Sequence, residues 1–127
     1  MAWDLDSGRP IYTQLVERIE LTIVSGYYKP GDKLPSVREL AVEAGVNPNT
    51  MQKAMSELER EGLLFTERTS GRFVTEDSGM IDKTREELAS VQIREFMEKM
   101  IQMGFGKEEI LSLLHKNLKE ERVWVQY

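Results

Sequence analysis

The sequence predicts a mainly α-helical fold of the α+β class, with three helices and a β-hairpin followed by two further helices. Two observations lead to this fold. Apolar residues recur at helical spacing in five segments that Pro and Gly separate, and the stretch LLFTERTSGRFVT instead carries two β-rich runs around a turn. The chain has 127 residues, enough for one small domain and a helical extension.

The first helix is predicted over residues 10–25. Its apolar residues recur at four-residue spacing, at Ile11, Leu15, Ile19 and Ile23. Pro10 at its first turn and Gly26 after its last periodic residue fit the usual start and stop signals. The connector YYKPGDKLP follows, and its Pro-Gly pair predicts a turn.

Two shorter helices follow this connector in close succession. Ser36 and Glu39 have the spacing of a capping box, which predicts a second helix that Gly45 ends. Asn47 is a favoured N-cap, and Pro48 stands at a first helical position, where its missing N–H costs nothing. The third helix should bury the face formed by Met51, Ala54, Met55 and Leu58.

The second half of the chain is predicted to begin with the hairpin, whose turn is Thr69-Ser70-Gly71. Residues 77–81 are expected to form a hinge, and residues 82–103 and 107–121 two further helices. The apolar end VWVQY is expected to pack against the rest of the chain. We therefore divide the chain into a domain at 1–76 and a helical region at 77–127.

Composition narrows the classes of function. The chain is 40% hydrophobic and 31% charged, values typical of a soluble globular protein. It has no Cys and one His, which argues against disulfides, thiolate catalysis, zinc sites and any metal or other cofactor. No apolar stretch is long enough to span a membrane and no signal peptide is visible, so a cytoplasmic protein is expected.

Three helices followed by a hairpin have the layout of a winged helix-turn-helix. In such a fold the third helix presents a polar first turn to the major groove, and the hairpin approaches the phosphate backbone. Residues 1–76 carry nine Lys and Arg against twelve Asp and Glu, a net charge of −3. DNA binding must therefore depend on a local basic patch.

The string PGDKLPSVRELAVEAGVNPNTMQKAMSELEREGLL, followed by SGRFV, resembles the N-terminal DNA-binding domain of GntR-type bacterial transcription regulators. The resemblance covers roughly residues 9–76. Only about fifty residues remain after it, which resembles the short YtrA-like branch of that family. The resemblance implies a homodimer that is held by the C-terminal helices and binds a two-fold symmetric operator in double-stranded DNA, most often as a repressor.

The resemblance also assigns candidate residues by position. Arg38 matches an arginine that family members use at the start of the second helix, and Asn49 and Gln52 fall in the first turns of the recognition helix. Many members have arginine where Pro48 and Gln52 stand, so two cations are absent here and side-chain amides remain to contact the bases. Because Asn and Gln pair with adenine, we expect A·T pairs opposite Asn49 and Gln52. The candidate DNA-binding residues are Ser36, Arg38, Asn47, Asn49, Thr50, Gln52, Lys53, Ser70, Gly71 and Arg72.

The C-terminal helices carry an apolar stripe rich in Met and aromatic residues. Such a stripe can bind a small hydrophobic molecule, but more often it is a core or a dimer seam, and two helices cannot enclose a cavity alone. Whether a small-molecule effector exists stays open. The expected dimerisation residues are Leu88, Val91, Phe96, Met97, Met100, Ile101, Ile110, Leu111, Leu114 and Leu118.

The sequence is also compatible with one other class of function and argues against another. A winged helix can serve as a protein-interaction module without binding DNA, and this is the main alternative. An enzyme is disfavoured because the sequence has no nucleophile–base pair, phosphate-binding glycine loop or metal-ligand set, so no catalytic residue is assigned. His115 is interpreted as a boundary residue of its helix, and Arg60 as an ordinary solvated one.

Overall fold

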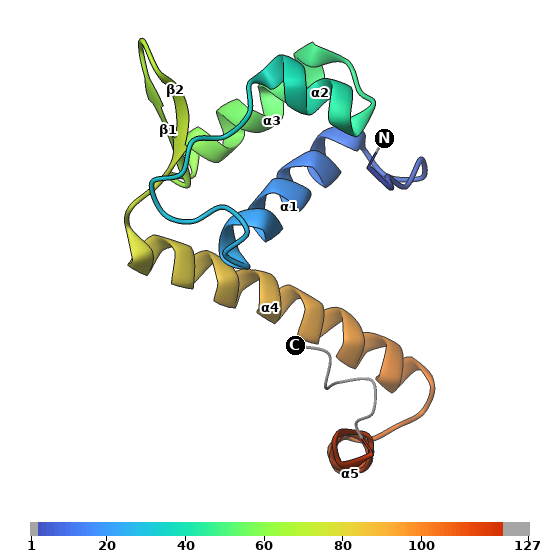
Figure 1. Cartoon of the computed structure of the whole chain (residues 1–127). Coiled ribbons are helices and arrows are strands. Elements are labelled where there is room, and N and C mark those ends of the chain that lie inside the picture. Colours follow the sequence, from blue (N-terminus) through green and yellow to red (C-terminus); the bar gives the residue numbers. More distant parts are fainter. Residues whose placement is uncertain (1–2, 121–127) are drawn as a thin grey trace. The chain divides into compact units, whose positions relative to one another are not determined.

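The computed structural model of the protein describes residues 3–120 (Figure 1). The predicted elements are confirmed, with ends that shift by a few residues. In chain order they are α1 (Ile11–Val24), α2 (Val37–Ala44), α3 (Pro48–Arg60), β1 (Leu64–Glu67), β2 (Gly71–Val74), α4 (Ser78–Gln102) and α5 (Lys107–Lys119). The expectation that VWVQY packs against the chain concerns residues outside the described part.

The chain divides into two compact units, residues 1–87 and residues 88–127. In the first unit, α3 packs against both α1 and α2. The side chains that fill its core with almost no exposure are Leu15, Ile19, Ile23, Met51, Met55, Leu58, Leu63 and Val74. The predicted apolar faces of α1 and α3 therefore meet each other and form the core.

A tight turn joins α2 to α3. Gly45 has a φ of 75°, a left-handed conformation that a residue with a Cβ adopts only at a cost. Its N–H donates to the carbonyl of Ala41 at 2.9 Å and closes α2. Asn47 then caps α3 and Pro48 begins it, as the sequence predicts. This turn places the N-terminus of α3 directly after the end of α2.

The hairpin is antiparallel, with Leu64 opposite Val74 and Thr66 opposite Arg72. The second edge of β2 pairs with the connector after α1, because the N–H of Leu34 donates to the carbonyl of Arg72 at 2.9 Å. A further bond joins the N–H of Gly31 to the carbonyl of Val74, also at 2.9 Å. Strand β2 is therefore held on both edges, whereas β1 is an edge strand.

The hinge expected at residues 77–81 is wrong, because α4 already begins at Ser78. The Oδ1 of Asp77 accepts a hydrogen bond from the N–H of Met80 at 3.1 Å, so Asp77 caps the helix. Ile81 is only 8% exposed and belongs to the first unit. The Ser78-Gly79 pair suggested a flexible segment, but the Asp77 cap and the burial of Ile81 stabilise a helix there instead. Among the described helices, none is long and apolar enough to cross a membrane.

Candidate nucleic-acid interface

The first turn of α3 presents polar side chains to solvent. Asn47 caps the helix, since its Oδ1 accepts a hydrogen bond from the N–H of Asn49 at 2.7 Å. Asn49, Gln52 and Lys53 are exposed, and Thr50 is half-buried. The opposite face of the helix is in the core, so these polar groups project outward on a rigid element.

Gln52 is partly ordered by its own helix. Its Nε2 donates to the Oγ of Ser56, one turn further on, at 3.1 Å. This bond uses one amide hydrogen and leaves the second hydrogen and the carbonyl oxygen of Gln52 for another partner. One donor and one acceptor are what an adenine edge requires in the major groove.

The start of α2 carries the predicted Ser36 and Arg38. The capping box is present: the Oγ of Ser36 accepts from the N–H of Glu39 at 3.1 Å, and the N–H of Ser36 donates to the carboxylate of Glu39 at 2.9 Å. The bond from this N–H lowers the pKa of Glu39, which keeps the cap in place at neutral pH. The hydroxyl hydrogen of Ser36 remains available to a phosphate oxygen. Arg38 is exposed, and none of the ion pairs within residues 3–120 includes it.

The tip of the hairpin lies one residue earlier in the chain than the predicted turn at 69–71, and two earlier than the candidate tip residues 70–72. Glu67 pairs with Gly71, so the loop consists of Arg68, Thr69 and Ser70. Gly71 is the first residue of β2 and has a φ of 116°. A Cβ there would lie 3.1 Å from the Cε of Lys33. Glycine at this position therefore serves the backbone turn and the passage of Lys33, and only Ser70 of the three predicted residues lies in the loop.

Arg72 also differs in placement from the predicted tip residue. It lies in the middle of β2, its side chain is 19% exposed, and its Nε lies 3.2 Å from the Oε1 of Glu59 in α3. The other carboxylate oxygen of Glu59 accepts a hydrogen bond from the hydroxyl of Thr66 in β1. Arg72 thus joins the hairpin to the recognition helix, and the cation at the tip is Arg68.

Two cations beside this surface escaped the sequence analysis. Arg68 is exposed in the loop, and a count of the residues between the two β-rich runs would have located it. Lys33 is exposed and lies against Gly71; its charge also contributes to the lowered pKa of Glu39. Lys33 therefore lies between the hairpin and the start of α2, a position that only the pairing of the connector with β2 reveals.

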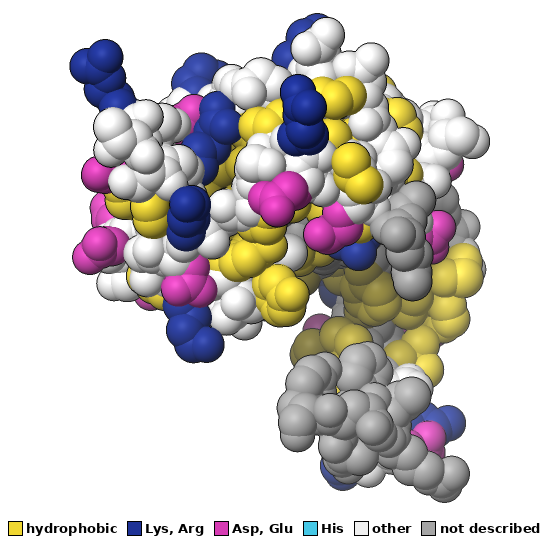
Figure 2. Space-filling view, turned by 45° about the horizontal axis from the view of Figure 1, so that its top comes forward, with side chains coloured by type: hydrophobic (Ala, Val, Ile, Leu, Met, Phe, Trp, Pro, Cys, Tyr) yellow, Lys and Arg dark blue, Asp and Glu magenta, His cyan; other side chains and the backbone are white. Residues whose placement is uncertain are grey.

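Figure 2 shows the molecule tilted so that the end with α2, α3 and the hairpin comes forward. Lys and Arg side chains are spread over the upper part of this view among uncharged groups, while Asp and Glu occur mostly lower down. This surface is not uniformly basic, in keeping with the net charge of −5 for the chain. The recognition helix itself carries carboxylates, but each of the two that lie between Ser56 and Arg60 has a basic partner: Glu57 with Arg60 and Glu59 with Arg72.

A shallow groove runs beside the outer face of α3, between it and the start of α1. Its lining includes Tyr12 on one side and Gln52, Lys53 and Ser56 on the other. Tyr12 is half-buried at the edge of this groove. The groove extends the polar surface of α3 toward α1.

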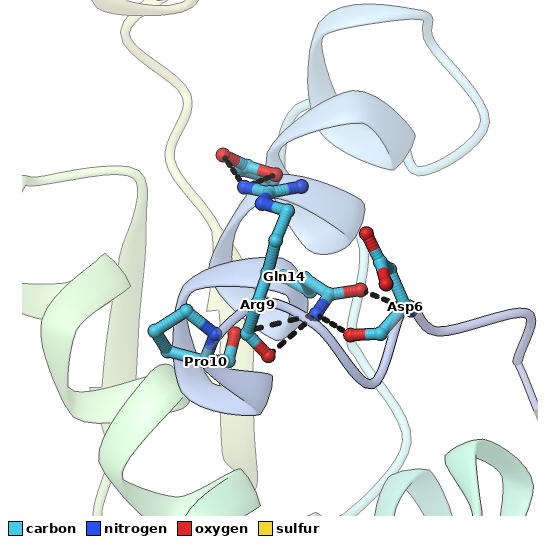
Figure 3. Close-up of polar contacts among 5 residues, drawn as sticks. Asp6, Arg9, Pro10 and Gln14 are labelled. Atoms are coloured by element: carbon cyan, nitrogen blue, oxygen red, sulfur yellow. Dashed lines mark hydrogen bonds and ion pairs between the residues drawn. The ribbon is translucent and has the colours of Figure 1, made fainter.

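Gln14, a buried polar residue, fixes the chain at the start of α1 (Figure 3). Its amide oxygen accepts from the N–H of Asp6 at 2.7 Å, and its Nε2 donates to the carbonyl of Asp6 at 2.6 Å and that of Arg9 at 3.1 Å. The lead-in is therefore tied to the helix, and Arg9 pairs with Glu17 at 3.0 Å. These bonds define where Pro10 and Tyr12 border the groove.

In the second unit, most of the expected dimerisation residues keep a substantial exposed area. The exposed fractions are 40% for Val91, 39% for Phe96, 54% for Ile101, 55% for Leu111, 39% for Leu114 and 55% for Leu118. Leu88, Met97 and Met100 are half-buried. Ile110 is only 2% exposed, so it has almost no surface to offer a partner and is a core residue of its own chain.

A helix-turn-helix with a short antiparallel wing, and with amides and cations facing outward, places the first unit in the winged-helix class of DNA-binding transcription regulators. The sequence of the same segment identifies a particular family within this class. The chain belongs to the family described as "Bacterial regulatory proteins, gntR family", whose sequence pattern matches residues 11–74. It is a YtrA-like member, and the family is one of regulators rather than enzymes.

Comparisons with individual proteins agree with this assignment. The HTH-type transcriptional repressor YtrA of Bacillus subtilis (strain 168) is 39% identical over 117 residues, which are 92% of this chain and 88% of that protein. A solved GntR family transcriptional regulator from Listeria monocytogenes is 40% identical with a TM-score of 0.82, over 88% of this chain and 98% of that one. The DNA-binding domain of AraR, solved in complex with operator ORX1, is 33% identical with a TM-score of 0.51, over 59% and 92% respectively.

Proposed function

We propose that the protein is a cytoplasmic, dimeric repressor that binds a two-fold symmetric operator. The observation that carries the proposal is the first two turns of α3, where Asn49, Gln52 and Lys53 are exposed behind the Asn47 cap, close in sequence to an exposed Arg38. The similarity to a domain solved with its operator and the name of the repressor YtrA support it.

In the proposed complex, Asn49, Thr50, Gln52 and Lys53 enter the major groove. Asn49 and Gln52 contact base edges, and selected half-sites should carry A·T pairs opposite them. Ser36 and Arg38 contact phosphates and set the depth of the helix, and Asn47 acts mainly as the cap. The hairpin contacts the flanking backbone through its loop, and Arg72 holds that hairpin to α3.

The proposed dimer uses the exposed apolar side chains of the second unit. A monomer would leave Ile101, Leu111 and Leu118 more than half exposed, which favours self-association. Two copies related by a two-fold axis would present two recognition helices to two half-sites, so operator symmetry would follow from protein symmetry.

Substitution of Arg38 by alanine tests the proposal. An operator is first selected from a library of two-fold symmetric sequences with the unaltered protein. We expect Arg38→Ala to weaken binding to this operator by at least about tenfold, since the phosphate contact is lost and no other cation is assigned to the start of α2. The measurement is a titration by fluorescence anisotropy at fixed salt, with sedimentation to show that the dimer is intact.

Arg85→Ala is the matched control. It removes the same charge from α4, where Arg85 pairs with Asp82 at 2.5 Å, and it should leave operator affinity within about twofold. If the unaltered protein selects no sequence even at low salt, where phosphate contacts are strongest, the chain is a protein-interaction module instead. If Arg38→Ala binds as tightly as Arg85→Ala, the assigned role of Arg38 is wrong.

A further inference from the structure

Glu59 occupies an unusual position for an acidic residue in a DNA-binding unit of negative net charge. It lies in the last turns of α3, and its carboxylate is 27% exposed. In the structure, its two oxygens bind two different strands of the hairpin.

The two partners of Glu59 form one cross-strand pair. Thr66 in β1 stands opposite Arg72 in β2, and each contributes one donor, the hydroxyl of Thr66 and the Nε of Arg72 at 3.2 Å. A single carboxylate therefore links α3 to both strands at the same level of the hairpin. Charge-assisted bonds of this kind are stronger than bonds between neutral groups.

The Thr66–Arg72 pair lies between the buried base of the hairpin and its tip. Side chains alternate between the faces of a strand, so Leu64 and Val74 share a face with Thr66 and Arg72. Leu64 and Val74 are 3% and 0% exposed and anchor the base of the hairpin in the core. Between this buried pair and the tip, no described apolar side chain of that face is buried. The loop begins at Arg68, two residues after Thr66. Glu59 is thus the last side-chain link between α3 and the tip.

The backbone does not replace this link. The connector after α1 holds β2 through backbone bonds such as that from Leu34 to Arg72, whereas β1 pairs with β2 alone among the described strands, so its outer edge has no strand neighbour. The aromatic pair Phe65 and Phe73, with ring centroids 5.7 Å apart, lies on the other face of the hairpin and connects the two strands. Glu59 therefore adds a side-chain restraint that joins α3 directly to both strands of the wing.

We propose that Glu59 is a positioning residue for DNA binding: by holding the Thr66–Arg72 pair against α3, it sets the wing so that the loop cation Arg68 reaches the backbone beside the half-site that α3 occupies. The proposal rests on the proposed function, because it presupposes an operator. It assigns a favourable role to a negative charge that by simple Coulomb repulsion should weaken DNA binding.

Charge repulsion predicts that loss of Glu59 strengthens DNA binding, whereas positioning of the wing predicts that it weakens binding. Two matched variants can therefore test the proposal. Glu59→Gln and Glu57→Gln each remove one negative charge from the same helix, two residues apart. Glu57 pairs with Arg60 at 2.5 Å and makes no contact with the hairpin in the described structure. If charge alone matters, both variants bind DNA more tightly and equally. If Glu59 positions the wing, Glu59→Gln binds the operator more weakly than Glu57→Gln.

We expect a difference of roughly tenfold in operator affinity between these two variants, which corresponds to the loss of one hydrogen bond to a charged group. Hydroxyl-radical footprints should show that Glu59→Gln loses protection at the flanks of each half-site but keeps it in the centre, a pattern that general destabilisation does not produce. The loss in the double variant Glu59→Gln/Arg72→Gln should then be smaller than the sum of the two single losses, because both single variants break the same Glu59–Arg72 pair.

The outcomes separate this inference from the proposed function. The inference is overturned if the unaltered protein binds its selected operator and Glu59→Gln binds it as tightly as Glu57→Gln with unchanged footprints. It is also overturned if the losses from Glu59→Gln and Arg72→Gln simply add. A failure of the unaltered protein to select any operator would contradict the proposed function itself, and with it the premise of this inference.

Discussion

At the scale of single residues, several charged side chains have partners that the sequence does not suggest. Glu20 in α1 and Glu61 at the end of α3 share a small cavity with Met80, Lys83 and Glu87 of α4. Burial, together with a hydrogen bond shared with Glu61 and the nearby charges of Glu61, Glu17 and Glu87, raises the pKa of Glu20 to about 8. Two carboxyl groups in one cavity therefore share a proton near neutral pH.

This pair predicts a dependence of stability on pH. A carboxyl whose pKa is raised in the folded state takes up a proton on folding between its unfolded value, near 4.5, and its folded value of about 8. Stability should therefore fall as pH rises through this window, and the loss is complete above it. Glu20→Gln removes the proton uptake, so its unfolding midpoint should exceed that of the unaltered protein at pH 8.5 and approach it at pH 5.

Thermal unfolding followed by circular dichroism at both pH values measures this difference. Glu67→Gln, at an exposed carboxylate of β1, is the control and should track the unaltered protein at both. An equal shift of the Glu20→Gln midpoint at pH 5 and pH 8.5 would show that the side chain matters through packing and not through its proton.

At the scale of elements, the turn between α2 and α3 has the strictest local requirement. Gly45 has a φ of 75° and ψ of 37°, and its N–H closes α2 on Ala41. Ala44, directly before Gly45, ends α2, and Asn47, two residues after it, caps α3, so a change of backbone angle at Gly45 moves the start of α3. Both stability and DNA binding should depend on this one conformation.

Gly45→Ala should destabilise the protein by about 1–2 kcal/mol, the cost of a Cβ in the left-handed region. Gly45→Asn should cost less, because asparagine enters this region more readily. Denaturant unfolding measures both values. Equal losses for Ala and Asn would indicate that the space around a side chain, and not the backbone angle, limits this position.

At the scale of the whole molecule, the second unit is distinguished by exposed apolar side chains that self-association would cover. Its exposed leucines and isoleucines have no covering group within the described residues, although Ile110 is already buried in its own chain. Helices with such a face are stable in water when a second copy covers it. The dimer proposal therefore depends on the outward residues of α4 and α5.

Leu114→Lys should raise the dimer dissociation constant by at least about tenfold, since it places a charge on a face that the dimer would bury. Ser112→Lys, at an exposed residue two positions earlier in α5, is the matched control and should leave the constant nearly unchanged. Analytical ultracentrifugation over a range of concentrations measures both. A dimer that tolerates Leu114→Lys as well as Ser112→Lys would place the seam elsewhere.

The sequence by itself determined the order of elements, the caps of α2 and α3 and the exposed groups of the recognition helix. These features are local: Ser36, Asn47 and Pro48 act within a few residues of their position in the chain, and helical periodicity assigns each side chain to a face. The hinge was missed because Ser-Gly is a turn signal that the Asp77 cap and the burial of Ile81 override.

Only the tertiary structure decided which charged groups meet. Arg72 was expected at the tip and instead bonds to Glu59, thirteen residues earlier, while Lys33 lies against Gly71 from a connector that precedes the whole helix-turn-helix. Such contacts depend on hairpin register and on strand–connector pairing, which bring distant parts of the chain together and leave no periodic trace in the sequence. The sequence therefore determines which residues form the surface proposed to face DNA, whereas packing determines the geometry of that surface.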